Sequence, residues 1–324
     1  MMLFVCGTGR CGHTVVAQTI ARHPDVAALP FESRFIIDPD GILDFYASYS
    51  TTWSYYLCGR RLKRLERFLD DVSRRPSWPH RLLSGAIRAL NPDGRILSPR
   101  AYDQWELDRH FPNFRIHSRA LLDRLIAFPF SACWFGTGSY RFAPALYHAP
   151  PMNKAELAEA LGDFLRAIIW GFLDRQGKSH FVDSNVFTFS LAKELLEVLP
   201  EAKILHVYRD PRDVVASYVR QRWCPQNKAQ AAHIVKAMME HWWTVRRELP
   251  AGSYGELGFE GLIEDTEEML RATCEFYDLP FHENMLGADL GYHNIGRWRR
   301  EFSPGEKKQV HKILGDIIEG LGYS

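Results

Sequence analysis

The sequence lacks the features that mark several classes of protein. Its cysteines are scattered over positions 6, 11, 58, 133, 224 and 274 and form no C-x-x-C pair, so neither a disulfide framework nor a structural zinc site is expected. No apolar run approaches the length of about 18 residues that a membrane-spanning helix requires. The first apolar run begins at Met2, which leaves no room before it for a signal peptide. These absences predict a reduced, cytoplasmic protein without a membrane span.

An excess of charge of either sign is also missing. The chain has 40 Lys and Arg residues against 39 Asp and Glu residues, which gives a formal net charge of +1. A charge so near zero produces no long-range field that would attract nucleic acid, so no nucleic-acid partner is expected. Anions must instead be bound by local basic clusters. The 324 residues, 46% of them apolar, are enough for one large domain or two with a full core.

Short apolar runs alternate with helical patterns over much of the chain, which predicts an α/β fold with a mostly parallel central sheet. Strands are expected at about 2–5, 26–29, 181–183, 203–208 and 255–259. The main helices are expected at about 154–175, 188–199, 211–222, 228–249 and 265–277. A last helix should begin after Ser303, which is a plausible N-cap with Glu306 as its capping-box partner.

Residues 40–150 differ from the rest of the chain. They are rich in Tyr, Trp, Phe, Arg and Pro, and they follow no regular alternation of strand and helix. A helical pattern at 60–73 carries several arginines, which form either a docking face for an anion or a solvated surface. We interpret residues 40–150 as an inserted helical, aromatic-rich subdomain of a single domain spanning 1–324, and expect it to bind a substrate or act as a lid.

A glycine-rich loop follows the first apolar run. Residues Gly7–Thr14, with the sequence GTGRCGHT, fit the phosphate-loop pattern G-x-x-x-x-G-K-[ST], except that His13 stands at the lysine position. Glycines allow backbone N–H groups to approach an anion, and the start of a helix adds the positive end of its dipole. The fixed positive charge lies inside the loop, at Arg10. These features predict a loop that binds a phosphate-like group.

A second motif follows the apolar run at 203–208. Residues Arg209–Ser217 read RDPRDVVAS, in which Asp210 is a good N-cap and the following proline suits the first helical position. Arg209 stands at the end of a strand, which is where α/β sheets bind ligands. With Ser217 about two turns into the helix, the motif can hold a second phosphate through charge-assisted hydrogen bonds.

At these two motifs the chain resembles the sulfotransferases that use 3′-phosphoadenosine 5′-phosphosulfate (PAPS). Gly9–Thr14 is similar to their 5′-phosphosulfate loop, often G-R-S-G-T-T, and Leu205–Ser217 is similar to their 3′-phosphate motif. Weaker similarities lie at Phe259–Asp265 and at Gly296–Ser303, the latter resembling the C-terminal G-D-W-K-x-x-F-T stretch. The resemblance spans residues 3 to about 320 and leaves 40–150 unmatched. It implies a P-loop-like three-layer α/β/α fold and metal-free transfer of a sulfuryl group to a hydroxyl or amine.

The resemblance also implies roles for particular residues. Arg10 would stabilise the leaving phosphate by preorganised electrostatics, while the loop residues Cys11, Gly12, His13 and Thr14 would contact the 5′-phosphosulfate. Arg209 and Ser217 would contact the 3′-phosphate. The C-terminal stretch would add Arg297 and Arg299 to the phosphates and stack Trp298 on adenine, unless this stretch is a solvated basic loop with Trp298 in the core. His13 either donates a hydrogen bond to the phosphosulfate or is only accommodated at this position without contacting it. Cys11 is either a small residue that faces the loop interior or an activated thiol.

Transfer to a hydroxyl requires a general base, and Glu32 is the first candidate. It follows the expected strand at 26–29, and His23–Val26 (HPDV) resembles the start of the H-P-x-V…G-E-E-T-R segment of tyrosylprotein sulfotransferases, whose second Glu is the base. The alternative is a surface Glu32–Arg34 pair, with His110 and His117 as reserve bases. Val182–Asn185 (VDSN) lacks the lysine that many relatives carry there, and Arg299 and Lys178 are the candidates to replace its charge.

Two other functions fit parts of the sequence. A phosphate-loop kinase or NTPase would require Lys at position 13 and a magnesium-binding Asp, for which only Asp183 is a nominal candidate. A noncatalytic nucleotide-binding protein would not need the retained Arg10, Glu32 and Arg209. The acceptor is expected to be a small molecule or a glycan, and neither its identity nor the oligomeric state follows from the sequence.

Overall fold

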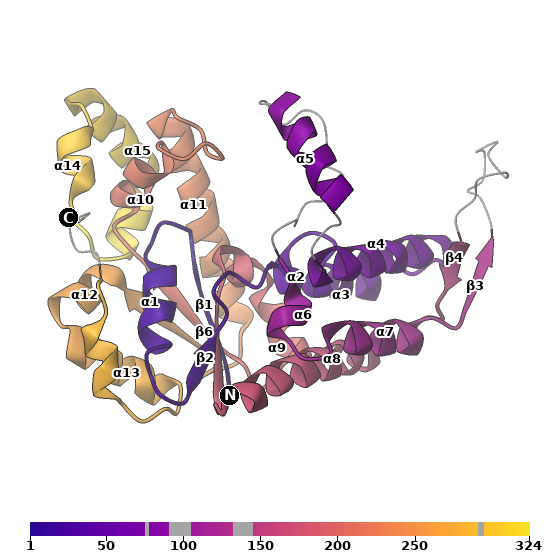
Figure 1. Ribbon diagram of the computed structural model, residues 1–324. Coiled ribbons are helices and arrows are strands. Elements are labelled where there is room, and N and C mark those ends of the chain that lie inside the picture. Colours follow the sequence, from indigo (N-terminus) through magenta and orange to yellow (C-terminus); the bar gives the residue numbers. More distant parts are fainter. Residues whose placement is uncertain (75–77, 91–104, 132–144, 291–294) are drawn as a thin grey trace. The chain divides into compact units, whose positions relative to one another are not determined.

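The computed structural model describes residues 1–74, 78–90, 105–131, 145–290 and 295–324. Two compact units make up the chain. One consists of Met1–Ser33 together with Gly177–Ser324, and the other is Arg34–Gln176. The second unit begins before residue 40 and also contains the long helix α8 (Lys154–Gln176), so it is wider than the segment 40–150 (Figure 1).

The first unit is built on a five-stranded sheet. Its order is β2 (Val26–Ala28), β5 (His180–Ser184), β1 (Met2–Gly7), β6 (Lys203–Tyr208) and β7 (Tyr254–Gly258), and every neighbouring pair is parallel. All six residues of the central strand β1 are buried, which is why it appears in the sequence as a continuous apolar run. The predicted mostly parallel sheet is confirmed. All carboxyl ends of the strands therefore meet at one edge, and the loop Gly7–Thr14 leaves from that edge.

The helices of the first unit follow their strands closely. They are α1 (His13–Ile20), α9 (Ala192–Val198), α10 (Pro211–Tyr218), α11 (Lys228–Val245), α12 (Phe259–Glu264), α13 (Thr266–Phe276), α14 (Arg297–Glu301) and α15 (Pro304–Gly320). The predicted caps are confirmed: Asp210 accepts the N–H of Arg212, and Ser303 and Glu306 form a capping box. Short 3-10 turns lie at η2 (Val186–Leu191), η3 (Arg246–Glu248) and η4 (Glu283–Gly287).

Three predicted helix boundaries were wrong. The helix expected at 188–199 begins as the 3-10 turn η2, because the Asn185 side chain caps Phe187 and starts the turn early. The helix expected at 211–222 ends at Tyr218, after which the chain forms turns such as Gln221 N–H to the Tyr218 carbonyl at 2.8 Å. The helix expected at 228–249 ends at Val245 and tightens into η3.

The second unit is mainly helical, as its sequence predicts. It contains α2 (Arg34–Ile37), α3 (Ile42–Thr51), α4 (Tyr55–Ser73), α5 (Trp78–Leu90), α6 (Leu107–His110), α7 (Phe114–Leu125) and α8. Aromatic side chains join these helices, with Phe35 in edge contact with Phe111 and Phe114, and Phe114 in edge contact with Phe164. An antiparallel hairpin of β3 (Phe128–Ser131) and β4 (Ala145–His148) was not predicted.

Candidate active site

The glycine-rich loop is a tight turn whose glycines have no room for a side chain. Gly12 has a φ of 99°, and a Cβ there would lie 2.3 Å from the Phe259 ring. A Cβ on Gly7 would lie 2.3 Å from the carbonyl oxygen of Val207. Arg10 is also in the left-handed region, with a φ of 56°. The backbone therefore turns tightly at the edge of the sheet. Helix α1 begins directly after this turn, with the hydrogen bond from Val16 N–H to the Gly12 carbonyl.

The structure joins this loop to the second motif. The Nε of Arg10 donates to the Oγ of Ser217 on α10 at 3.0 Å, although the two residues are 207 positions apart. The hydroxyl of Tyr218, the next residue on α10, donates to the carbonyl of Thr8. Strands β1 and β6 are neighbours in the sheet, so the segments that follow them meet at the same edge. A guanidinium and a hydroxyl, both able to donate to an anion, thus lie together.

Arg209 lies between two carboxylates at the end of β6. Its guanidinium is 3.2 Å from Asp213 and 3.8 Å from Glu260, and only 8% of its side chain is exposed. Asp213 also accepts the backbone N–H groups of Gly296 at 2.7 Å and Trp298 at 3.0 Å. The same buried carboxylate therefore orients Arg209 and anchors the C-terminal GRWRREFS segment to α10.

Trp298 is held by the cap of α10. Its indole N–H donates to Asp210 at 3.1 Å, and the Arg212 guanidinium lies 4.0 Å from the centre of its ring. Arg212 in turn forms a fork on Asp210 through Nε at 2.9 Å and a terminal nitrogen at 2.8 Å. Arg212 is a site residue that was not predicted, although its place in the RDPR run was a signal. Trp298 thus has a structural role whether or not it also meets a nucleotide base.

The other two residues of the C-terminal stretch differ in their surroundings. Arg297 is partly buried and pairs with Glu301 at 3.2 Å, one turn further along α14. Arg299 is exposed, with its guanidinium 5.3 Å from the Trp298 ring. Lys178 lies before β5, at the amino-terminal edge of the sheet, and donates to the carbonyl of Pro24. Because the loop lies at the opposite edge, Lys178 cannot supply the missing cation.

His13 is at the centre of a buried cluster. Its Nδ1 lies 3.6 Å from the Cys11 thiol, and its Nε2 lies 3.6 Å from Glu32 Oε1 and 3.3 Å from the Thr14 hydroxyl. Burial favours the neutral ring, but the contacts with Cys11 and Glu32 outweigh it and raise the pKa of His13 to about 9. Burial also opposes ionisation of Cys11, and the contact with His13 outweighs it and lowers the thiol pKa. The protonated His13 ring is therefore stabilised by the two acidic groups beside it, Cys11 and Glu32, which balance its charge.

Glu32 reaches this cluster from the end of β2. About a quarter of its side chain (24%) is exposed, while its Oε2 atom is buried and its Oε1 atom contacts His13. The next residue, Ser33, donates its backbone N–H to Asp183 Oδ1 at 3.1 Å. Burial raises the pKa of Asp183 to about 6, and the nearby charge of Glu32 adds to the effect. Asp183 is thus a buried anchor for the segment that carries Glu32, which does not suit the metal ligand of a kinase.

The two reserve histidines lie in the second unit. His110 ends α6, and burial, with the charge of Arg175 adding, lowers its pKa. His117 lies on α7. Neither belongs to the unit that carries the loop.

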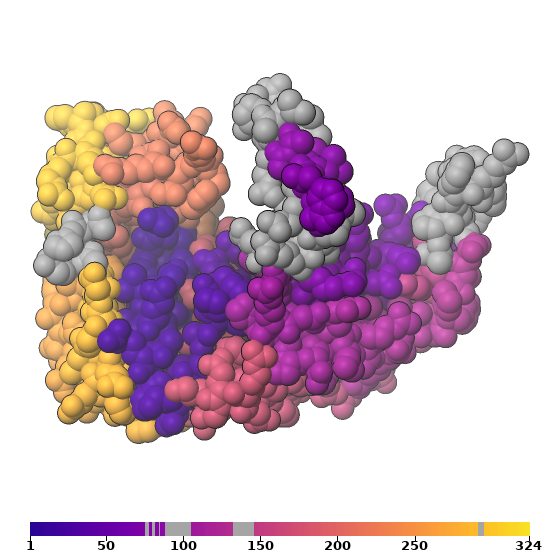
Figure 2. Space-filling model, viewed as in Figure 1, coloured from indigo at the N-terminus to yellow at the C-terminus, as the bar shows by residue number. Residues whose placement is uncertain are grey.

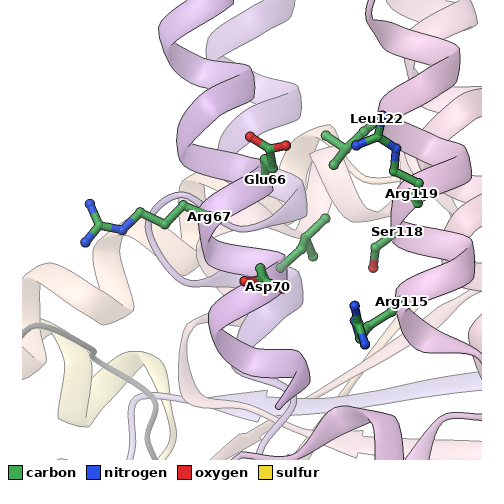
Figure 3. Close-up of a pocket in the computed structure, with 8 residues that line it drawn as sticks. Glu66, Arg67, Asp70, Arg115, Ser118, Arg119 and Leu122 are labelled. Carbon is green, nitrogen blue, oxygen red and sulfur yellow. The ribbon is translucent and has the colours of Figure 1, made fainter. Parts of the chain in front are cut away.

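The second unit contains a cavity of about 410 Å³ between α4 and α7 (Figure 3). Its carboxylates already have partners, since Glu66 accepts from Tyr147 at 2.6 Å and Asp70 pairs with Arg74 at 2.9 Å. Arg115 and Ser118 project from α7 into the space between the helices. The full lining is Glu66, Arg67, Leu69, Asp70, Arg115, Ser118, Arg119 and Leu122. The cavity is therefore polar, with more guanidinium groups than carboxylates.

Most basic side chains of α4 have partners within their own unit. Arg61 donates to the Thr52 carbonyl at 2.7 Å, Lys63 pairs with Glu66 at 3.1 Å, and Arg64 lies 3.6 Å from Asp40. This pairing favours a solvated surface over an anion-docking face for these three residues. In the parts of the chain that the structure describes, no helix is long and apolar enough to cross a membrane.

Comparison with known proteins identifies the class. A model of the sulfotransferase family matches residues 106–283, just over half of the chain, and the chain belongs to this family. Membership of this family argues against the interpretation as a phosphate-loop kinase or NTPase. The match begins after the glycine-rich loop, so the loop residues and their roles rest on their own geometry.

Individual relatives are distant. An uncharacterized protein of Aquifex aeolicus (strain VF5) is 28% identical over 179 residues, which are 47% of this chain and 23% of that protein, so the chain spans about a quarter of its relative's length. The sulfotransferase domain from the curacin biosynthetic pathway is 13% identical with a TM-score of 0.50, covering 99% of this chain and 97% of that domain. The sulfotransferase domain of the Synechococcus PCC 7002 olefin synthase is 15% identical with a TM-score of 0.47, and the match covers 100% of this chain and 94% of that domain. The curacin domain shows the shared fold.

Proposed function

We propose that this protein transfers the sulfuryl group of PAPS to a hydroxyl or amine of a small-molecule or glycan acceptor. The observation that carries the proposal is the 3.0 Å contact between Arg10 and Ser217. It unites, in a member of the sulfotransferase family, two motifs that were each predicted from the sequence to hold a phosphate. PAPS has two such anionic groups on one adenosine.

The residues present fit this donor. The turn at Gly12 leaves no space for a Cβ and brings backbone N–H groups to the start of α1, which suits the 5′-phosphosulfate. Arg10 and the loop residues Cys11, His13 and Thr14 would contact that group, while Ser217 and Arg209 would hold the 3′-phosphate. Arg297 and Arg299 are further candidates for the phosphates. No metal ion enters this proposal, because the guanidinium of Arg10 supplies a fixed positive charge and the loop supplies backbone N–H groups.

Sulfuryl transfer requires two things of these side chains, stabilisation of the leaving phosphate and removal of a proton from the acceptor. As the bond from sulfur to the acceptor oxygen forms and the bond to the bridging phosphate oxygen breaks, Arg10, His13 and the loop N–H groups offset the charge on the leaving oxygen. Glu32 takes the proton of the acceptor hydroxyl. The contact of His13 Nε2 with Glu32 Oε1 at 3.6 Å would position this base beside the glycine-rich loop.

We assign acceptor binding to residues of about 40–150, within a single sulfotransferase domain spanning 1–324. The cavity between α4 and α7 is a candidate place for a polar part of the acceptor. The scattered cysteines of the sequence support a reducing compartment, and we propose the cytoplasm.

Thermal-shift titration with adenosine 3′,5′-bisphosphate (PAP) in the presence of EDTA tests the donor site. Wild type should be stabilised, and Arg10→Ala should be stabilised far less. Arg220→Ala is the matched control, because Arg220 is an exposed arginine just beyond α10 that pairs with Glu301. Incubation with labelled PAPS and a fractionated metabolite extract then identifies the sulfated product. Absence of any shift at millimolar PAP contradicts the proposed donor.

A further inference from the structure

Helix α5 exposes large apolar side chains that the proposed chemistry does not use. Trp78 is 71% exposed, Leu82 64% and Leu83 53%, which place them among the most exposed large apolar residues of the described chain. Figure 2 shows the described atoms of α5, in purple, at the surface. Single exposed apolar residues are ordinary, but three within six positions of one helix indicate a surface that meets something else.

The apolar residues of α5 share one side of the helix. At about 100° per residue, positions 78, 82, 83, 86, 87, 89 and 90 fall within one half of the helical circumference. All of them are Trp, Leu, Ile or Ala. The other half holds positions 80, 81, 84, 85 and 88, which are His, Arg, Ser, Gly and Arg. Trp78 stands at the border between the two halves, where its amphipathic ring is suited to a boundary between apolar and aqueous surroundings.

The charge of this region has one sign. Between residues 75 and 90 the sequence has three arginines, at 75, 81 and 88, and neither Asp nor Glu. Helix α4 differs, because its basic side chains are interspersed with the acids Glu66, Asp70 and Asp71. A basic half, a broad apolar half and a tryptophan at the border are the features of helices that lie in the plane of a membrane surface. An acidic protein groove would match the arginines but would not require so wide an apolar side.

We propose that α5 is an interfacial helix that binds the protein to an anionic lipid bilayer. Its apolar half would enter the boundary between headgroups and acyl chains, and its arginines would lie among the anionic headgroups. This proposal is independent of the donor site and of the sulfuryl transfer.

Co-sedimentation with vesicles tests the proposal on the full chain. Wild type should bind vesicles of phosphatidylcholine with about one third phosphatidylglycerol and bind pure phosphatidylcholine much more weakly. The double variant Leu82→Glu/Leu83→Glu should lose at least tenfold in partitioning, because both leucines would leave the acyl boundary. Ile116→Glu is the matched control, since Ile116 on α7 is also 66% exposed, and it should bind as wild type does. Arg81→Ser/Arg88→Ser should lose roughly fivefold per arginine, on anionic vesicles only.

Three results would overturn the proposal. The first is no binding of wild type to the anionic vesicles at physiological salt. The second is equal binding by wild type and Leu82→Glu/Leu83→Glu, with circular dichroism and melting temperature unchanged in both. The third is a wild-type dimer in light scattering that this double variant converts to a monomer without any effect on vesicle binding, which would make the face a contact between copies of the chain.

Discussion

His206 should make the stability of this protein fall in mild acid. The residue lies on β6, is fully buried, and stacks on Trp242 with ring centres 4.5 Å apart. Neither ring nitrogen has a hydrogen-bond partner among the described residues. Burial, with the charges of Arg246 and His13 adding, lowers the pKa of His206 to about 3. The native protein therefore keeps this ring neutral over the whole physiological range.

The magnitude follows from proton linkage. In the unfolded chain His206 has a pKa of about 6.5. Below that pH the unfolded state therefore binds a proton at this residue that the folded state does not bind. Stability is therefore lost as pH falls from about 6.5 toward 3, at about 1.4 kcal/mol per pH unit. Between pH 7 and pH 5 the loss assigned to His206 is about 2 kcal/mol.

Asp183 works in the opposite direction. Its pKa is raised to about 6 by burial, so its ionised form destabilises the folded state, and stability is regained as pH falls through 6. Wild type alone would show the sum of these effects and those of the other groups whose pKa folding shifts, such as His13 and His110. The comparison must therefore be made between wild type and a variant that removes His206 and leaves Asp183 in place.

His206→Phe is that variant, because it keeps a flat ring against Trp242 and cannot titrate. Urea unfolding at pH 7, 6 and 5 gives the free energy of unfolding for both proteins. From pH 7 to pH 5 wild type should lose about 2 kcal/mol relative to the variant. His233→Phe, at an exposed position on α11, is the control and should follow wild type. Equal pH dependence of wild type and His206→Phe would refute the reasoning.

Three further predictions concern the proposed donor site. Glu32→Gln should lower the rate of sulfuryl transfer by about 10²–10⁴ and leave PAP affinity nearly unchanged, because it removes the base and keeps the shape; steady-state kinetics and calorimetry measure the two. Arg209→Ala and Ser217→Ala should each weaken PAPS binding by about tenfold per lost contact of about 1.4 kcal/mol. Competition assays should show a far smaller loss in the binding of adenosine 5′-phosphosulfate, because this donor lacks the 3′-phosphate. Asp213→Ala should free the segment Gly296–Ser303, because it removes the acceptor of two backbone N–H groups, and limited proteolysis should cut there first.

Each of these has a distinct contrary outcome. Wild-type turnover in Glu32→Gln would move attention to His110 and His117, while a lower melting temperature with normal turnover would assign Glu32 a structural role. Equal losses for both donors would show that Arg209 is not the 3′-phosphate ligand. An unchanged proteolysis pattern in Asp213→Ala would show that the C-terminal segment is anchored elsewhere.

The local elements of this protein follow from its amino-acid sequence alone. The buried strands β1 and β6 appear as apolar runs, and the caps at Asp210 and Ser303 follow from residues three or fewer positions away. The resemblance of the two phosphate motifs was equally local, since each is a continuous stretch. Such features depend on backbone preferences and neighbouring side chains, which a linear pattern contains.

How these elements meet depends on the tertiary structure. The contact of Arg10 with Ser217 requires β1 and β6 to be adjacent, and the strand order also brings Glu32 to His13. The anchoring of Trp298 by Asp210 and Asp213 joins segments about 85 positions apart. No periodicity in the chain encodes such contacts, because they arise from the packing of several strands and helices at once. The electrostatics follow the same rule, since the raised pKa of His13 and the lowered pKa of His206 depend on burial and on neighbours that only the fold supplies.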